Sequence, residues 1–347
     1  MARRLRFFGP GLDLIAAAIA VLIVSSLAAA QEPAAYDALV DQYARGDLAG
    51  PLRELGRWSA SAVRNVTTDR PRFLTAQRQR AAVMLHTEMA NAWLQAHATA
   101  DASLHLSVAR RALTAMKNGG RGDERTQMFE RRWFAFVASM YTSQGILNQA
   151  ELIVRDGLGL YGHDALLLVA RGAIREMDAM LTAANPRGGT TALQISRSFE
   201  SSAADYRRAL DYDDTLATAH LHLGWVRFLG RDDRSGHDFE LALEHATDDG
   251  TRYLAHLFLG AFAEHKNNLD DARGHYEAAL ALGPAYQTAY VALSHVEEAR
   301  GNPARARDLA RAYAALAAKE EDPWWNYHLG GFDQPTLDWL RREARSR

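Results

Sequence analysis

Apolar positions in the C-terminal half of the chain are grouped into blocks with helical spacing. Between residues 253 and 263, apolar side chains cover most of the circumference of a helix, which is typical of a helix packed on more than one side. The sequence Lys-Asn-Asn at residues 266–268 interrupts this block and predicts a turn. Apolar residues then recur at spacings of three and four as far as Gly283-Pro284, which ends a second, amphipathic helix. Residues 253–286 therefore predict a helical hairpin.

The next hairpin repeats this one at a spacing of 34 residues without a gap. The recurring pairs are Leu259 and Leu293, Gly260 and Ser294, Asn268 and Asn302, Ala272 and Ala306, Arg273 and Arg307, and Leu282 and Leu316. A fixed period of this length indicates one supersecondary unit copied along the chain, with each copy burying its apolar face against the next. Gly260 and Ala272 are small where the two helices should cross, so a bulky side chain there should overpack the contact at a cost of about 1–3 kcal/mol.

The positions shared by these copies resemble the tetratricopeptide repeat family. That family places Leu-Gly in its first helix, a small residue and then an aromatic residue in its second helix, and a proline after it. The matching residues are His256, Leu259, Gly260, Ala272, Tyr276, Ala279 and Pro284, then Tyr290, Leu293, Ser294, Gly301, Ala306 and Tyr313. The first copy lacks the early aromatic residue, and Tyr313 stands where alanine is usual. The resemblance implies an all-α fold, a right-handed α-solenoid of stacked antiparallel helical hairpins.

Weaker copies of the pattern extend the predicted solenoid upstream. Residues 134–157 carry a good copy, and residues 217–246 carry one that is shorter by one residue. A further first helix begins at Leu166, and the loop at residues 185–189 separates it from its partner helix. Two more hairpins are expected before residue 118, so the chain should hold about six or seven stacked hairpins.

These patterns divide the chain into four predicted regions. Residues 1–30 form a signal peptide, and residues 31–123 form degenerate helical hairpins. Residues 124–320 form the tetratricopeptide-like solenoid, and residues 321–347 form an aromatic-rich cap with a capping helix.

The cap follows from the need of every solenoid to hide the apolar face of its last repeat. The residues expected to cover that face are Trp324, Trp325 and Phe332, with Leu337, Trp339 and Leu340 behind them. An exposed aromatic ridge that binds carbohydrate or protein is the alternative interpretation of the same residues.

The N-terminal segment predicts export. Three arginines at positions 3, 4 and 6 precede an apolar run from Leu14 to Ala30, which ends in the small-x-small form of a signal-peptidase site. We expect cleavage after Ala30, which gives a periplasmic or secreted protein. An uncleaved inner-membrane anchor that faces the periplasm is the alternative, because a run of 17 residues is at the short limit for spanning a bilayer.

Composition agrees with an exported bacterial protein and excludes several chemistries. Arginine and alanine are abundant and lysine is rare, a bias typical of GC-rich bacterial genomes. The net charge of −2 gives no electrostatic footprint for nucleic acid or anionic lipid, so we expect no nucleic acid partner, and membrane contact only through an uncleaved N-terminal segment. Cysteine is absent, which excludes disulfides and thiol catalysis. No nucleophile-elbow, zinc-protease or phosphate-loop motif occurs, so we expect no catalytic residue, cofactor or metal.

Histidines leave one alternative function open. Nine of the 13 lie between His220 and His328. His220 and His222 point to different faces of one helix, whereas His220 and His256 occupy equivalent places in adjacent repeats and could approach each other. We expect these side chains to replace packing aromatic residues. The alternative is a sugar-binding, metal-binding or hydrolytic protein that uses the histidine-rich C-terminal half.

The resemblance also implies a partner-binding groove, because tetratricopeptide solenoids line their concave face with first helices that bind peptides or partner helices. Transferred by register, the groove residues are Arg132, Ser139, Thr142, Trp225, Phe228, Leu254, Leu257, Ala261, Glu264, His265, Val291, His295 and Glu298. Trp225 and Phe228 would be anchors, because aromatic residues carry a disproportionate share of binding energy; packing in the core is the equal alternative. Leu257 and Val291 replace polar groups of the carboxylate-binding members, so the groove should favour apolar or helical ligands.

The sequence therefore predicts a non-catalytic scaffold or adaptor in the bacterial cell envelope. Its partner would be another envelope protein or peptide, held in the concave groove. A membrane-tethered protein with the same fold is the first alternative, and the N-terminal residue of the isolated protein would decide between the two.

Overall fold

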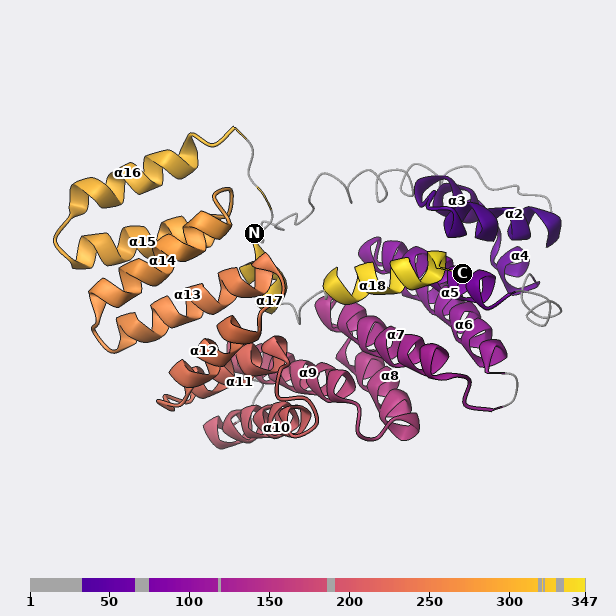
Figure 1. Cartoon of the computed structure of the whole chain (residues 1–347), viewed down its shortest axis with the longest axis horizontal. Helices are drawn as coiled ribbons and strands as arrows, with labels where there is room; N and C mark the ends of the chain where they lie inside the picture. The colour runs from indigo at the N-terminus through magenta and orange to yellow at the C-terminus, as the bar shows by residue number, and fades with distance from the viewer. Residues whose placement is uncertain are drawn as a thin grey trace. The chain divides into compact units, whose positions relative to one another are not determined.

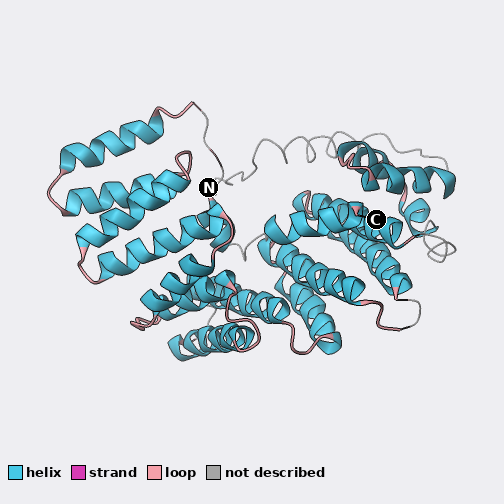
Figure 2. Ribbon diagram, in the orientation of Figure 1, coloured by secondary structure: helices cyan, strands magenta, loops and turns pink. Residues whose placement is uncertain are grey.

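The structure is a computed structural model that describes most of the chain after residue 32. The described residues are 33–65, 75–117, 120–185, 191–317, 320, 322–328 and 334–346. All regular secondary structure within these ranges is helical (Figures 1 and 2), which confirms the predicted all-α fold class. The predicted signal peptide, residues 1–30, lies outside the described residues.

The chain forms two compact units. Unit 1 comprises residues 1–144 and 333–347, and unit 2 comprises residues 145–332. The predicted cap region is therefore shared between them, with α17 (Pro323–His328) in unit 2 and α18 (Gln334–Arg345) in unit 1. The region boundaries drawn from the repeats stay predictions.

Most helices of unit 1 pack around one long helix, α5. Before α18 it contains α2 (Pro33–Ala44), α3 (Ala49–Leu55), α4 (Ala60–Asn65), α5 (Ala76–Gln95), α6 (Thr99–Met116) and α7 (Glu124–Ser143). The helix α5 packs along α6, and α2 packs against α3 and α5. The C-terminal helix α18 lies along α5 and also contacts α7 and α2 (Figure 1). It therefore covers one face of α5, together with parts of α7 and α2.

Within its described residues, unit 2 is a stack of helical hairpins followed by α17. Its other helices are α8 (Leu147–Leu160), α9 (Ala165–Ala184), α10 (Ala192–Leu210), α11 (Ala217–Leu229), α12 (Ser235–His245), α13 (Asp249–His265), α14 (Leu269–Leu282), α15 (Gln287–Ala299) and α16 (Pro303–Ala314). From α9 onward the two helices of each hairpin pack together, and each second helix packs on the first helix of the next hairpin (Figure 1). Cohesion between sequence neighbours is the arrangement expected of a solenoid.

Several of the described hairpins close with the same kind of turn. Residues with positive φ follow the first helices, among them His97, Arg231, Asn267 and Gly301. Just after Asn267, the backbone N–H of Asn268 donates to the Ala263 carbonyl at 2.8 Å, and the equivalent bond follows Gly301 at the same distance. This closure of a helix C-terminus by a left-handed residue satisfies carbonyls that the helix itself leaves open. The turn predicted at residues 266–268 is confirmed.

Glycines let the two helices of a hairpin approach closely. A Cβ on Gly260 would lie 2.4 Å from Cε1 of Tyr276, and a Cβ on Gly172 would lie 2.5 Å from Cε1 of Tyr206. Ala272 is fully buried at the same crossing as Gly260. The predicted close crossing of the two helices is therefore confirmed.

The aromatic segment after α16 packs differently from the predicted cap. The ring of Trp324 contacts Trp225 on α11 and Phe258 on α13, with centroid distances of 5.2 and 5.4 Å. Trp325 is 40% exposed. The aromatic rings of α17 thus cover first helices earlier in the stack, not the last repeat.

The remaining predicted cap residues also lie elsewhere. Leu337 and Leu340 are buried in α18, which belongs to unit 1, and Phe332 lies outside the described residues. The helix α16, which ends the stack of hairpins, needs little cover. Only Ala306 and Leu309 of this helix are buried, and most of its other residues are exposed. A terminal helix with a polar outer face ends a solenoid without an apolar cap.

Candidate functional site

Three predicted groove residues belong to α7 in unit 1. Thr142 is 1% exposed and its hydroxyl donates to the Ala138 carbonyl at 2.8 Å, so it is a core residue. Ser139 is half-buried. The Arg132 guanidinium lies over the ring of Trp339 in α18, with its Cζ atom 4.3 Å from the ring centroid. At Arg132 the face of α7 is therefore covered by a helix of the same chain.

Most predicted groove residues on α11 and on the first half of α13 lie in the core of unit 2. Trp225, Leu254 and Leu257 are buried, and Phe228 is half-buried beside them. Trp225 stacks on Phe258 with a centroid distance of 5.0 Å. Trp225 is therefore packed in the core, which is the alternative to a binding anchor that the sequence left open.

The other predicted residues line an accessible surface on α13 and α15, called the α13–α15 surface below. They are Ala261, Glu264, His265, Val291, His295 and Glu298. Val291 is 58% exposed, and the side chain of His295 is 69% exposed. The two helices are joined across this surface, because Nδ1 of His295 lies 2.5 Å from Oε1 of Glu264. The structure thus brings together the predicted residues of the two tandem repeats.

A Glu–Tyr–His constellation lies within this surface. Glu264 stands one helical turn after Gly260 on α13, and the Tyr276 hydroxyl of α14 donates to its Oε2 at 3.0 Å. His295 of α15 contacts the other oxygen. Burial raises the pKa of Tyr276, and so do the charge of Glu264 and this hydrogen bond, which keeps the phenol a donor. Three consecutive helices therefore meet at one carboxylate.

A similar constellation, which was not predicted from the sequence, occurs a second time in unit 2, although its histidine stands two residues before Gly224, whereas His295 stands one residue after Ser294. Glu176 stands one turn after Gly172 on α9, and the Tyr206 hydroxyl of α10 donates to its Oε2 at 2.7 Å. Nδ1 of His222, on α11, lies 3.0 Å from the same oxygen. All three polar side chains of this copy are buried. The sequence signal is Gly-x-x-x-Glu in a first helix followed by tyrosine in the second helix.

Histidines also form two close pairs across hairpins. The Nδ1 atoms of His86 and His105 are 2.8 Å apart, and those of His256 and His275 are 3.2 Å apart. Nε2 of His220 lies 2.8 Å from a backbone carbonyl oxygen of the preceding loop, so that contact, and not one with His256, satisfies this nitrogen. Across the described ranges no group of three or more His, Asp or Glu side chains is arranged to hold a metal ion.

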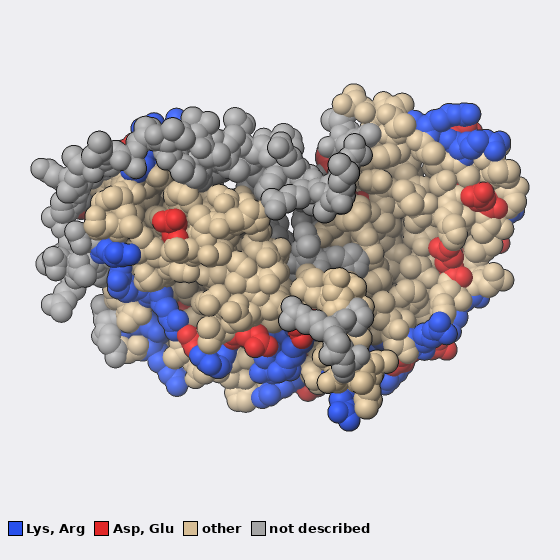
Figure 3. All heavy atoms as spheres, turned by 180° about the vertical axis from the view of Figure 1, so that it is seen from behind, with Lys and Arg blue, Asp and Glu red and all other residues tan. Residues whose placement is uncertain are grey.

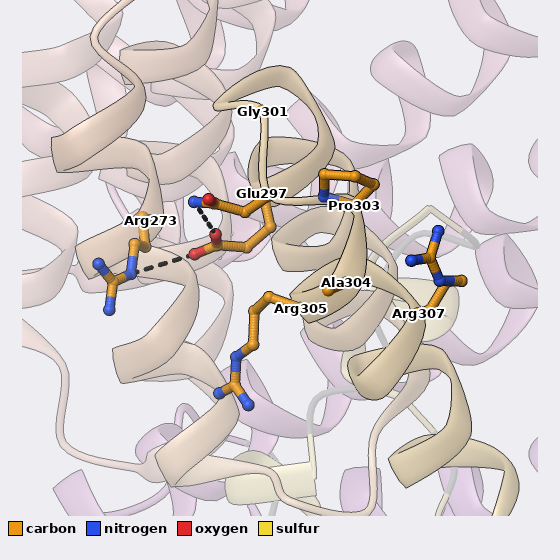
Figure 4. Close-up of a pocket in the computed structure, with 8 residues that line it drawn as sticks. Arg273, Glu297, Gly301, Pro303, Ala304, Arg305 and Arg307 are labelled. Atoms are coloured by element: carbon orange, nitrogen blue, oxygen red, sulfur yellow. Dashed lines mark hydrogen bonds and ion pairs between the residues drawn. The ribbon is translucent and has the colours of Figure 1, made fainter.

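A shallow depression of about 520 Å³ lies where α14, α15 and α16 meet, and arginines line it (Figure 4). Nε of Arg273 lies 3.2 Å from Oε1 of Glu297, and the Asn302 side chain donates to the other oxygen of Glu297 at 2.9 Å. Arg305 and Arg307 also border the depression. Glu297 is buried and both of its carboxylate oxygens are paired, so its contact with Arg273 links the repeat of α14 to the repeat of α15.

Charged side chains of both signs are interleaved on the face shown in Figure 3, where Lys and Arg lie beside Asp and Glu. Ion pairs also join neighbouring repeats, such as Arg300 with Asp270 and Lys266 with Asp233. Exposed pairs of this kind stabilise a fold little.

Comparisons with known proteins give only distant likenesses. The sequence matches no protein-family model and no curated protein. Similar solved structures include that of pilF from Pseudomonas aeruginosa, at 14% identity and TM-score 0.46, covering 62% of this chain and 90% of that chain. A tetratricopeptide repeat protein from Parabacteroides merdae is 12% identical with TM-score 0.43, covering 76% and 99%. A human IFIT1 dimer with PPP-AAAA is 16% identical with TM-score 0.45, covering 88% and 68%.

At such low identities, none of these proteins indicates what this chain binds. The chain's own hairpins define its class: the 34-residue period, the left-handed turns and the glycine–tyrosine crossings are those of a tetratricopeptide-like helical repeat protein. None of the helices in the described ranges has both the length and the apolar character needed to cross a bilayer.

Proposed function

We propose that this protein is a non-catalytic scaffold of the bacterial cell envelope that binds a segment of a partner protein at the α13–α15 surface. The observation that carries the proposal is the exposure of Val291 beside the polar pair of Glu264 and His295. An apolar contact beside hydrogen-bonding groups is the combination that recognises a peptide segment. Helical repeat proteins use extended surfaces of this kind to hold partners.

The recurrence of the Glu–Tyr–His constellation favours a binding role over catalysis. Its first copy, around Glu176, is sealed in the core of unit 2, where no substrate reaches it. The role common to both copies is to join three consecutive helices through one carboxylate. The side chains of the copy around Glu264 are also accessible to solvent, so they can contact a partner.

The envelope location rests on the N-terminal pattern of arginines, apolar run and small residues. Mass spectrometry of the isolated protein should find Gln31 at its N-terminus. An intact N-terminal segment would favour the membrane-tethered form of the same scaffold. Nucleic acid is not a proposed partner, because the chain is near neutral, and a gel-shift assay with single-stranded RNA checks this prediction.

The surface itself is tested by comparing two charge substitutions at exposed apolar residues. Val291→Glu places a carboxylate within the α13–α15 surface, whereas Leu152→Glu places one on α8, where Leu152 is also exposed. Both variants should fold, because neither residue is buried. Quantitative mass spectrometry of captured envelope proteins should show a partner that Val291→Glu loses and Leu152→Glu keeps. Identical partner sets for both variants would remove the proposed surface.

A further inference from the structure

A pair of histidines bridges the α13–α14 hairpin. His256 lies on α13 and His275 lies on α14, and these two helices pack side by side (Figure 1). Their Nδ1 atoms are 3.2 Å apart, and their ring centroids are 5.5 Å apart with an interplanar angle of 39°. The partner of His256 is therefore the histidine 19 residues later in its own hairpin.

The separation of the two nitrogens suits the ligand shell of a metal ion. Zinc and similar ions bind histidine nitrogen at about 2.0–2.1 Å. An ion at that distance from both Nδ1 atoms would make an N–metal–N angle of about 100–106°, close to the tetrahedral value of about 109°. The two nitrogens can therefore serve as neighbouring ligands of one ion.

The protonation state of the two rings also suits a metal ion. Burial lowers the pKa of both His256 and His275, and the charge of His275 lowers the pKa of His256 further. Both rings are therefore neutral at pH 7, which is the form of imidazole that binds a metal. When each Nδ1 takes the ion, the ring proton is carried on Nε2, so binding changes the tautomer without loss of a proton.

The surroundings of this pair favour a cation and are open to solvent. The charges of Asp271, one turn earlier on α14, and of Glu240 on α12 act on His275 and oppose the effect of burial on its pKa. Both of these carboxylate residues are exposed, and both histidines are only half-buried. A hydrated cation is therefore attracted to the pair and can reach it from solvent.

The other close pair, His86 and His105 of unit 1, lacks these properties. Both rings are buried, and Nε2 of His86 lies 3.1 Å from the Tyr36 hydroxyl. Their Nδ1 atoms are 2.8 Å apart, so an ion bound to both would need an N–metal–N angle of only about 84–89°. A hydrated ion also has no exposed ring edge at which to enter. Of the two pairs, only the one in α13 and α14 suits a metal ion.

We propose that His256 and His275 bind one late first-row divalent metal ion, such as Zn²⁺ or Cu²⁺, through their Nδ1 atoms. Within the part of the chain that the structure describes, no third His, Asp or Glu is arranged to complete the site, so water molecules fill the remaining positions. The bound ion fastens α13 to α14. Cu²⁺ should bind more tightly than Zn²⁺, which is the usual order for a given set of nitrogen ligands. Neither histidine belongs to the α13–α15 surface, so this inference is independent of the proposed function.

Isothermal titration of the full chain, purified without a histidine tag, with Zn²⁺ tests the site. We expect one ion per chain, and binding weaker by at least about tenfold in His256→Leu and in His275→Leu, because even the outer-shell partners of metal ligands contribute that much. The matched control is His163→Ala, because His163 is an exposed histidine of unit 2 whose Nδ1 contacts the Tyr212 hydroxyl. Its affinity for Zn²⁺ should be unchanged. Mg²⁺, which prefers oxygen ligands, should not bind to the pair.

Two measurements on the unaltered chain do not depend on whether the leucine variants fold. The electron paramagnetic resonance spectrum of bound Cu²⁺ should show hyperfine coupling to two imidazole nitrogens. Free Zn²⁺ at ten times its Kd should slow hydrogen exchange through opening of the α13–α14 hairpin about tenfold, because an ion that binds only the closed hairpin shifts the opening equilibrium by that factor. Exchange in α5 and α6 should not change.

Three results would overturn the inference. Absence of Zn²⁺ binding to the unaltered chain would show that the two rings only hydrogen-bond to each other. An affinity that persists in both His256→Leu and His275→Leu would place the ion at other histidines. A Cu²⁺ spectrum with coupling to one nitrogen or to none would exclude the pair as the ligand set.

Discussion

Lowering the pH from 7 to 4 should loosen the α5–α6 hairpin of unit 1 through two buried histidines. His86 and His105 are buried, and their Nδ1 atoms face each other at 2.8 Å. Nε2 of His86 lies 3.1 Å from the Tyr36 hydroxyl, so the other side of this ring is also occupied. At neutral pH one Nδ1 donates to the other, whereas two imidazolium rings would place two N–H donors face to face.

The size of the effect follows from the histidine pKa values. Burial lowers the pKa of His86 well below 6.5, and the nearby His105 and Arg111 lower it further. Burial also lowers the pKa of His105 from 6.5 to about 4. The unfolded chain binds a proton at His105 below pH 6.5, and the folded chain does so only below about pH 4. The stability is therefore complete above pH 6.5 and is lost as the pH falls to 4, by about 3 kcal/mol for His105 alone.

Hydrogen exchange measured by mass spectrometry is the suitable assay, because a chain with two units has no single unfolding free energy. Peptides from α5 and α6 should lose protection between pH 6.5 and 4, after correction for the intrinsic exchange rate. The double variant His86→Leu, His105→Leu should show a smaller loss, because its hairpin has no imidazole to protonate.

The second histidine pair provides a matched control. His256 and His275 have the same separation in sequence and a similar Nδ1 distance of 3.2 Å, but they are only half-buried. Burial lowers the pKa of both, so replacing them with leucine should change the exchange of α13 and α14 and leave α5 and α6 as in the unaltered chain. An equal pH-dependent loss in α5 and α6 with and without His86 and His105 would refute the reasoning.

Four further substitutions test the packing within the two units. Gly260→Ala should destabilise the α13–α14 hairpin by about 1–3 kcal/mol, because its Cβ would lie 2.4 Å from an aromatic ring atom. Gly274→Ala, in open space on α14, should stabilise the same hairpin by about 0.5–1 kcal/mol. Hydrogen exchange in peptides from α13 and α14 compares the two variants. Asp322→Ala removes the two hydrogen bonds that join the α17 segment to Tyr253 and Thr288, and should weaken its attachment by about 1–3 kcal/mol, seen as faster proteolysis near residue 322. Glu88→Gln should cost about 2–3 kcal/mol and release α18, because Glu88 accepts two hydrogen bonds from Arg341, at 2.9 and 2.6 Å; unchanged hydrogen exchange in α18 would contradict this.

The repeated hairpin could be predicted from the sequence because its determinants are local. The turn after α13, the crossing at Gly260 and the period that carries Asn267 to Gly301 all depend on residues within one or two helices of each other. A helix is recognised by the spacing of its apolar residues, and a turn by the residue that tolerates positive φ. The same register placed Glu264 and His295 on one surface.

The interior position of other predicted groove residues could not be predicted in this way. Trp225 occupies a groove register, yet α17 covers it with residues that lie about a hundred positions later in the chain. Arg132 is covered in the same manner by Trp339 of α18. A register states which side of a helix a residue occupies, and it does not state whether a distant segment also packs there.

The sequence by itself determined the helical hairpin, its period and the residues that close each turn, because these depend on spacing and backbone preference along a short stretch. Only the tertiary structure decided where the aromatic C-terminal segment packs, and hence which first helices are covered and which remain exposed. It also revealed that glutamate, tyrosine and histidine from three consecutive helices meet at two places, buried around Glu176 and accessible around Glu264. The physical reason is that burial is set by contacts between segments far apart in sequence, and local patterns do not encode which of two equivalent surfaces such a segment will cover.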